Sequence, residues 1–351
     1  MSKLNLLETR SQLAVINLMD TPKTFLRDTF FTKVEKFPTA KVDVDIKKGH
    51  RKMAPFVHER IGGKLVENTG FYTETYQPPL VGPHTVTTAF DLMMRTAGES
   101  TSGGMTPEER GKKKFLEDSL MLEEMITRRE EYMCAQAIFE GKIDVVGEGL
   151  NHVIDFNHTN RETLSGKKLW SDPTSQPLGD IKRWVRQVQI TGFVNVDTMI
   201  MASDVVDEFL RHPDIKEMLD VRKYSLGEMS PRQLPNGVTY IGTLTREGID
   251  IYEYNEHFLD DFTDEKNPKM KPLVPAGTVA LLNSRADYAR LYAAVTIADD
   301  KSNALVTYEE TRVPSQWVER NPARQMYQLN AKPLMVPTQA DSWFVAHVLE
   351  A

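Results

Sequence analysis

Residues 49–65, GHRKMAPFVHERIGGKL, carry the side chains that most suggest a chemical site. His50 and His58 could bind a metal ion, and the Gly-Gly-Lys run that ends at Lys64 could bind a phosphate. A Walker phosphate loop requires a glycine five residues before its Gly-Lys pair and a Ser or Thr after the lysine, but His58 and Leu65 stand there. An HExxH zinc site requires a second histidine, which does not follow His58. The stretch therefore predicts neither kind of site.

No other segment supplies a catalytic or metal-binding pattern. His152 and His158 are six residues apart, which matches no common spacing of metal ligands. The acidic run at 260–265 lacks the glycine and the terminal glutamate of an EF-hand loop. Ser100 lies in a flexible run, GESTSGG, and not in a G-x-S-x-G turn, and the sequence contains no GxGxxG. We therefore expect no catalytic residue, no cofactor and no metal, and we predict that the protein is not an enzyme.

The charge is unevenly distributed along the chain. The 351 residues carry a net charge of −7, which argues against a general nucleic-acid-binding protein. Residues 1–60 contain 12 Lys and Arg against 7 Asp and Glu, a balance of +5, so the remainder carries −12. A basic arm on an acidic body could contact an anionic partner on one face, or it could simply be solvated.

Cys134 is the only cysteine, which excludes an internal disulfide and a zinc site built from several cysteines. It lies in the apolar helical segment EEYMCAQAIFEG, which predicts a buried structural thiol. This cysteine usage is typical of a protein made in a reducing cytoplasm. The apolar run at 13–19 is too short to span a membrane and lacks the features of a signal peptide, so we expect no membrane partner.

The first ninety residues predict extended elements. The segment KTFLRDTFF follows a Thr-Pro helix start at Thr21 and gathers its large apolar side chains mainly on one side, so this short helix needs a surface to dock on. The alternation in KVDVDIKKG, 41–49, predicts a strand with one solvated face. From there to about residue 90, strand-like pieces broken by Gly and Pro predict a two-stranded excursion, which a partner chain would support.

A very long helix follows this excursion. Thr106 and Glu109 form a capping-box pattern, and Gly141 is well placed to end the helix. Phe115, Leu122, Ile126, Met133 and Ala137 fall on or near one stripe. The helix would contain roughly 28–34 residues and extend about 42–51 Å.

A more conventional α/β section spans about 179 to 300. Helices are predicted at 179–192, 203–212 and 213–222, and strands at VDTMIMA, GVTYIGTL, GIDIYEY and GTVALLNS. The chain closes with two further strand segments, RQMYQLNAKPLMVP and SWFVAHVLE, joined by a polar turn.

This order of parts resembles the major capsid proteins of tailed bacteriophages, and the lambda-type major head protein family in particular. The similarity lies in FLRDTFF, in GKLVENTGFYTETYQPPLVGPHTVT and above all in WVERNPARQMYQLNAKPLMVPTQADSWFVAHVL. In that family a tryptophan, Pro-Ala-Arg, an apolar strand, Ala-Pro-Leu-Met and a closing strand recur in this order. Here the corresponding positions begin at Trp317, Pro322, Lys332 and Phe344, with Lys332 replacing a small residue.

The resemblance implies an α+β fold, the tailed-phage major capsid fold of the Hong Kong phage type. Its expected parts are an N-terminal arm, an extended loop (E-loop), a peripheral domain with a spine helix at about 106–140, an axial domain, and C-terminal strands that return to the peripheral domain. Their boundaries are expected at 1–40, 41–90, 91–178, 179–310 and 311–351.

The resemblance also implies a function. The protein would be a structural subunit that assembles with itself into pentamers and hexamers of an icosahedral head around double-stranded DNA, without sequence specificity. Scaffold, portal and decoration proteins would be further partners, and the protein would be found in the virion after assembly in the host cytoplasm. Two alternatives remain: a bacterial shell of the same fold that encloses cargo enzymes, and an enzyme with a scattered site.

Under this resemblance the opening stretch lies in the E-loop, and its charges would contact neighbouring subunits. The candidate intersubunit residues of the arm and the E-loop are Phe30, Phe31, Arg51, Lys52, His58, Glu59, Arg60, Lys64 and Tyr72.

Overall fold

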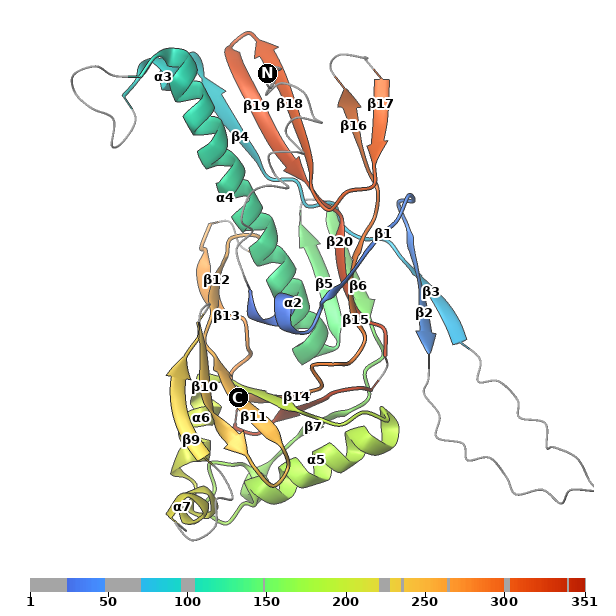
Figure 1. The fold of residues 1–351 in the computed structure, drawn as a ribbon, viewed down its shortest axis with the longest axis vertical. Coiled ribbons are helices and arrows are strands. Elements are labelled where there is room, and N and C mark those ends of the chain that lie inside the picture. The colour runs from blue at the N-terminus through green and yellow to red at the C-terminus, as the bar shows by residue number, and fades with distance from the viewer. Residues whose placement is uncertain are drawn as a thin grey trace, which may run out of the picture.

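The computed structural model describes residues 24–47, 71–95, 105–147, 149–220, 228–234, 237–263, 266–299, 304–339 and 341–350. Within these residues, one long helix runs from a group of β-hairpins to a layer of sheet and helices (Figure 1). We call the first region the hairpin end and the second the sheet end. The mixture of helices and separate small sheets confirms the predicted α+β class.

The long helix, α4 (Pro107–Ala135), continues as a π-helical turn, η1 (Gln136–Glu140). Its start is the predicted capping box: Thr106 Oγ1 accepts from the Glu109 N–H at 3.3 Å, and Glu109 Oε2 accepts from the Thr106 N–H at 2.8 Å. Gly141 follows the last turn with a φ of 65°, a left-handed conformation that glycine adopts without steric cost. Both predicted ends of the helix are confirmed.

The sheet end contains a seven-stranded mixed sheet and three helices. In spatial order its strands are β7 (Arg161–Thr163), β21 (Phe344–His347), β14 (Thr278–Leu282), β8 (Thr198–Met201), β11 (Ile249–Tyr254), β10 (Val238–Leu244) and β9 (Glu228–Gln233). Its helices are α5 (Pro177–Thr191), α6 (Ser203–Arg211) and α7 (Pro213–Asp220), which confirm the three predicted helices. Every residue of β8 and β14 is buried, as their continuous apolar sequences require.

The hairpin end is built beside the first turns of α4. It contains α3 (Ala89–Met93), a three-stranded sheet of β18 (Val313–Arg320), β19 (Ala323–Asn330) and β4 (His84–Thr88), and the hairpin of β16 (Val295–Asp299) and β17 (Ala304–Tyr308). A small core joins this sheet to the helix. Leu122 and Ile126, in the predicted stripe of α4, are buried there against Tyr327 and Leu329.

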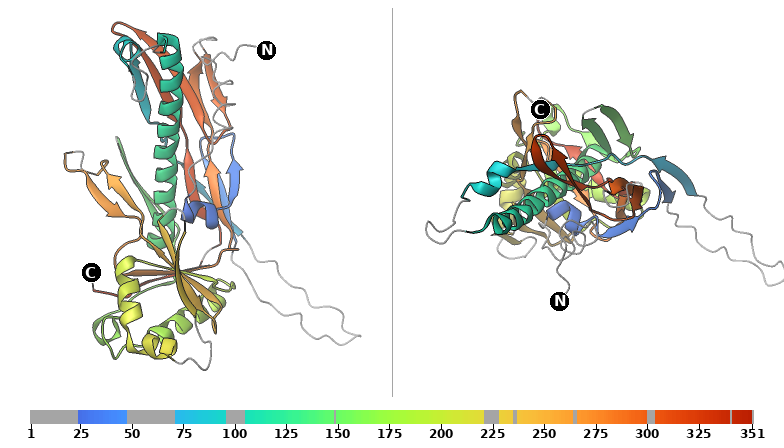
Figure 2. Two further views of the ribbon diagram at one scale, coloured as in Figure 1. Left: turned by 60° about the vertical axis from the view of Figure 1, so that its left-hand side comes forward. Right: turned by 90° about the horizontal axis from the view of Figure 1, so that it is seen from above.

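Several shorter elements accompany these two groups. They are α2 (Phe25–Thr29), the sheet of β1 (Lys33–Lys36), β15 (Tyr288–Tyr292) and β20 (Pro333–Pro337), the hairpins of β5 (Lys142–Gly147) with β6 (Leu150–Asp155) and of β12 (His257–Asp260) with β13 (Lys269–Pro272), and the 3-10 turn η2 (Gly166–Lys168). Figure 2 shows α2 lying beside α4. None of the described helices combines the length and apolar character that crossing a membrane requires.

The described part of the expected E-loop is a two-stranded ribbon. Strand β2 (Val42–Lys47) pairs antiparallel with β3 (Phe71–Tyr76), and within the described residues neither pairs with another strand. The segment 48–70 between them lies outside the described residues. Strand β4, which was also expected in the E-loop, instead pairs with β19 at the hairpin end.

The C-terminal segment divides between the two ends of the molecule. Strands β18 and β19 lie at the hairpin end. Strand β21 instead pairs with β14 in the seven-stranded sheet, with Phe344 opposite Leu281. The segment 311–351 therefore divides between separate sheets. Likewise, β16 and β17 lie at the hairpin end, although their residues fall inside the expected axial range of 179–310.

Candidate functional site

The described N-terminal helix is anchored by a carboxylate from the long helix. The Glu131 Oε1 and Oε2 atoms accept hydrogen bonds from the backbone N–H groups of Leu26 and Arg27, each at 2.8 Å. These N–H groups lie in the first turn of α2, where an α-helix has no internal acceptors and where negative charge is favourable. Tyr254 also donates its hydroxyl to Glu131 Oε1, at 2.8 Å. Burial raises the pKa of the Glu131 carboxyl, against these hydrogen bonds, which lower it.

The neighbouring carboxylate, Glu130, is fully buried and joins three other segments. It accepts from Arg27 Nη1 at 3.2 Å, Arg312 Nη1 at 2.7 Å and the Tyr292 hydroxyl at 2.9 Å. Burial raises the pKa of this carboxyl, but the two guanidinium groups and the hydroxyl outweigh that effect, so the pKa of Glu130 lies below its usual range. A second nitrogen of the same guanidinium group, Arg312 Nε, donates to Glu123 Oε2 at 2.7 Å.

We call the group formed by Arg27, Glu123, Glu130, Glu131 and Arg312 the anchor cluster. Each of its five side chains is almost completely buried, and each is hydrogen-bonded. Each carboxylate accepts hydrogen bonds from other groups of the same chain, so none of the three is left to bind a substrate. Its chemistry is that of a fixed structural joint between α2, α4 and the segment before β18.

The predicted site residues of the arm lie in the protein's own core. Phe30 and Phe31 are 1% and 0% exposed, and their rings lie 6.5 Å and 5.3 Å from the ring of Tyr288. Their assignment as intersubunit contacts is therefore corrected, because neither side chain has surface left for a neighbouring copy. The surface that the arm helix needs is supplied by its own chain, at α4 and β15.

The remaining predicted site residues come from the expected E-loop. Tyr72 lies on β3, where it pairs with Ile46 of β2. The other six, Arg51, Lys52, His58, Glu59, Arg60 and Lys64, lie outside the described residues. Cys134 is buried, as predicted, and burial raises the pKa of its thiol well above the usual value.

A second feature, which the sequence reasoning missed, is the exposed apolar surface of the hairpin end. On α4, Leu116, Leu120, Met121 and Met125 are each 45–47% exposed. At α3 and the start of α4, the exposed side chains are Phe90, Met93, Met94 and Met105. The signal was present in the segments DLMM and LMLEEM, because these apolar residues do not fit the stripe that α4 buries. Exposed apolar side chains that gather on one surface are typical of protein contact sites.

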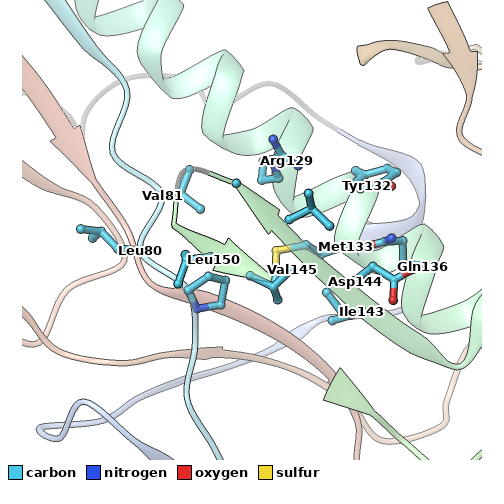
Figure 3. Close-up of a pocket in the computed structure, with 13 residues that line it drawn as sticks. Leu80, Val81, Arg129, Tyr132, Met133, Gln136, Ile143, Asp144, Val145 and Leu150 are labelled. Atoms are coloured by element: carbon cyan, nitrogen blue, oxygen red, sulfur yellow. The ribbon is translucent and has the colours of Figure 1, made fainter. Parts of the chain in front are cut away.

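A cavity of about 250 Å³ lies where α4 meets the β5–β6 hairpin (Figure 3). Met133, Ile143, Val145 and Leu150 are among its apolar lining residues, and Arg129 lies at its edge. Within the described residues, no group of three or more His, Cys, Asp or Glu side chains is arranged to hold a metal ion.

An arm helix, a protruding ribbon, one long helix and a layered sheet domain together define the fold of tailed-phage major capsid proteins. A solved prophage capsid protein from Escherichia coli CFT073 shares this fold, with a TM-score of 0.71, 19% sequence identity, and coverage of 97% of this chain and 99% of that one.

The family is established by the sequence comparisons. The family model described as phage major capsid protein E matches residues 8–348, so the chain belongs to that family. It is 25% identical over 346 residues to the major capsid protein of Escherichia phage N15, covering 95% of this chain and 97% of the relative. It is also 25% identical over 348 residues to the major capsid protein of Enterobacteria phage phi80, again covering 95% and 97%.

Proposed function

We propose that this chain is the structural subunit of a phage head, and that it assembles with itself into pentamers and hexamers of an icosahedral shell around double-stranded DNA. The observation that carries the proposal is the family match, which extends over residues 8–348. Relatives that cover nearly the whole chain are named as major capsid proteins of phages N15 and phi80. The role is structural and not catalytic, in agreement with an anchor cluster whose groups are all engaged within the chain.

The described geometry suits a subunit that contacts several neighbours. The 29 residues of α4 give a stiff element of about 44 Å, which the anchor cluster fastens to α2 and to the segment before β18. Apolar side chains remain exposed at the hairpin end, and the β2–β3 ribbon projects to one side (Figure 2). Different surfaces on one subunit make heterologous contacts, which close into rings and, with curvature, into a shell.

The remaining predicted contacts come from the expected E-loop. We infer that Arg51, Lys52, His58, Glu59, Arg60, Lys64 and Tyr72 contact a neighbouring subunit. Their support is that β2 and β3 pair only with each other within the described residues, since an isolated two-stranded ribbon is marginally stable without further packing. Reversing the charges of Arg51 and Lys52 should weaken assembly and leave the unfolding of the unassembled subunit unchanged.

The further partners follow from the same role. Scaffold and portal proteins would direct assembly in the host cytoplasm, a decoration protein would bind the outer surface, and the completed subunit would reside in the virion. The packaged DNA would be contacted through its phosphates without sequence readout. The net charge of −7 supports weak contact, because an acidic shell does not hold a polyanion tightly.

The test is to express the protein alone and together with a scaffold protein, and then to measure particle size by sedimentation and electron microscopy. Closed shells, or free pentamers and hexamers, are the expected products. Nuclease-protected DNA in particles made during infection would support a phage head, whereas an enclosed enzyme would indicate a cargo shell. A compact monomer at every protein and salt concentration, with scaffold present, would contradict the proposal.

A further inference from the structure

A groove at the sheet end concentrates positive charge. It lies between α5 and the turn that joins β10 to β11, and its volume is about 520 Å³. Its charged lining consists of Lys182, Arg183, Arg186 and Arg246, with Glu247 as the one carboxylate. This local excess of cations occurs in a chain whose net charge is −7. Figure 1 shows α5 at the edge of the sheet end that lies farthest from the hairpin end. We call this site the basic groove.

The spacing along α5 places three of these cations on one face of the helix. Ile181, Trp184 and Val188 are buried in the main hydrophobic core. Residues three or four positions apart share a helix face, so 182, 183 and 186 gather on the side opposite to this buried stripe. All three side chains are exposed. The packing of the helix therefore directs its positive charge away from the sheet.

The fourth cation comes from the neighbouring hairpin. The β10–β11 turn is tight, because the N–H groups of Glu247 and Gly248 both donate to the Leu244 carbonyl, at 3.1 Å and 2.8 Å. Glu247 Oε1 lies 3.7 Å from Lys182 Nζ, and this ion pair joins the turn to α5. Arg246, which precedes Glu247 in the turn, is exposed and lines the groove beside the helix.

Two of the four cations are already paired, and two are not. Arg183 donates to Glu162 at 2.6 Å and to Asp180 at 2.8 Å, so carboxylates of the chain hold its guanidinium group. Lys182 is paired with the turn, as described. Among the described residues, neither Arg186 nor Arg246 forms an ion pair with a carboxylate. Two guanidinium groups in one groove thus remain available to an external anion, and the groove concentrates their field.

The side chains of the groove select the class of anion. Val185 is the one apolar side chain in the lining, whereas sites for small organic ligands are mostly apolar. No aromatic side chain lines the groove, so it lacks the platforms on which the bases of a single strand stack. Arginine suits phosphate, because its planar guanidinium group donates two parallel hydrogen bonds to phosphate oxygens. These features favour the backbone of a duplex, in which the bases are already stacked.

We propose that the basic groove binds the phosphate backbone of double-stranded DNA, with Arg186 and Arg246 donating to phosphate oxygens. The inference rests on the proposed function, which brings packaged DNA to the shell, and it assigns that contact to particular residues. Contacts to phosphate carry no sequence information, so the site holds DNA of any sequence. Two available cations in each copy give a weak contact that is repeated around the shell.

A charge-matched pair of double variants tests the groove in the unassembled subunit. Arg186→Gln with Arg246→Gln removes both unpaired cations, whereas Lys269→Gln with Arg320→Gln removes the same charge from exposed strand positions outside the groove. The probe is a fluorescent DNA duplex of mixed sequence, and its Kd is measured over a range of salt concentrations. Thermal unfolding of each variant verifies that the subunit remains folded.

The groove variant should bind the duplex at least about fivefold more weakly at low salt, and its slope of log affinity against log salt should be smaller by about 1.8, since each phosphate contact contributes about 0.9. The control variant should bind as the wild type does. Equal weakening of both variants would show a general charge effect and contradict the inference. Inorganic phosphate at equal ionic strength should displace the duplex no better than chloride. Displacement by inorganic phosphate alone would indicate a site for a free anion and also contradict it.

A footprint on whole particles tests the same contact in the shell. Phenylglyoxal modifies accessible arginine side chains, and mass spectrometry reads the sites. Arg186 and Arg246 should react more slowly in DNA-filled shells than in empty shells, whereas Arg320 should react equally in both. The comparison isolates DNA, because contacts between protein subunits are present in either kind of shell.

The outcomes separate this inference from the proposed function. Equal modification of Arg186 and Arg246 in filled and empty shells would overturn the inference and leave the proposed function standing. Protection that is already complete in empty shells would mean that a protein covers the groove, which would overturn the inference as well. A wild type that forms no shell, with scaffold present, would overturn both.

Discussion

The two halves of α4 belong to one continuous helix but have different surroundings. In the C-terminal half, Glu130, Glu131, Met133 and Cys134 are almost completely buried, even though two of them are acidic. In the N-terminal half, Leu120 and its apolar neighbours are about half exposed. Along this helix some acidic side chains are therefore buried while some apolar side chains are exposed, the reverse of the usual arrangement. The difference indicates that the C-terminal half holds the subunit together, whereas the N-terminal half is left incomplete for contact with other molecules.

The largest difference between the halves should appear when one carboxylate is neutralised in each. Glu130→Gln leaves the buried guanidinium groups of Arg27 and Arg312 undercompensated, and it should lower the free energy of unfolding by about 3–5 kcal/mol in urea denaturation. Glu108→Gln removes an exposed pair with Lys112 at the start of the same helix and should leave the unfolding transition unchanged. Equal effects of the two substitutions would contradict the assignment of the anchor cluster as a stabilising joint.

Truncation of apolar side chains compares the buried and the exposed faces of α4. Ile126→Ala removes a side chain with no exposed surface and should destabilise the subunit by about 2–5 kcal/mol. Leu116→Ala, at a residue 46% exposed, should change the unfolding free energy by less than about 0.5 kcal/mol. The same urea titration measures both. A large loss for Leu116→Ala would mean that this face is already packed within the subunit.

A histidine near the C-terminal end of the helix should make the stability of the subunit depend on pH. His158 stacks on Trp343 with ring centroids 4.0 Å apart, and Trp343 Nε1 donates to the Ile138 carbonyl at 2.9 Å, which ties the residue before β21 to η1. Burial lowers the pKa of His158 from 6.5 to about 4. The unfolded chain therefore binds a proton near pH 6.5 that the folded protein resists until about pH 4, so stability falls as the pH falls through this interval.

The expected loss from His158 between pH 7 and pH 5 is about 2 kcal/mol. His158→Phe keeps an aromatic ring against Trp343 and should flatten this part of the profile, leaving a smaller slope from His347, whose pKa burial also lowers. Unfolding free energies measured at both pH values provide the check. A profile identical to that of the wild type would show that His158 does not titrate in this way.

A smaller effect is expected at the residue that ends η1. A Cβ added at Gly141 would lie 2.8 Å from the Cβ of His158, in addition to occupying the left-handed conformation. Gly149 shares a positive φ, but a Cβ there would meet nothing within 4 Å. Gly149→Ala should therefore cost about 1 kcal/mol, and Gly141→Ala about 1 kcal/mol more, in thermal unfolding. Equal losses would mean that the contact with His158 relaxes freely.

The sequence predicts the local features of this fold well. The capping box at Thr106, the stop at Gly141 and the stripe through Leu122 and Ile126 depend on residues within a few turns of one another. The anchor cluster could not be predicted, because Arg27 and Glu130 are 103 positions apart and no local pattern pairs them. A buried carboxylate also has the same sequence signature as a solvated one, so Glu130 and Glu131 read as surface residues.

The features that the sequence did not predict correctly also depend on long-range contacts. Phe30 and Phe31 form an apolar cluster that the sequence marks correctly as needing a partner, but only the tertiary fold shows that Tyr288 of the same chain provides it. The pairing of β21 with β14 likewise joins segments that are far apart in the sequence. Strand composition predicts that a strand exists, and it does not predict which sheet the strand joins.

We expect the exposed apolar side chains of the hairpin end to become covered between copies in the shell. Peroxide oxidation of methionines, read by mass spectrometry, tests it on the unaltered protein. Met93, Met94, Met121 and Met125 are 45–76% exposed, and the fully buried Met335 serves as an internal control. These four methionines should oxidise fast in unassembled protein and be protected in the shell, whereas Met335 should oxidise slowly in both. Equal oxidation of the four methionines before and after assembly would contradict it.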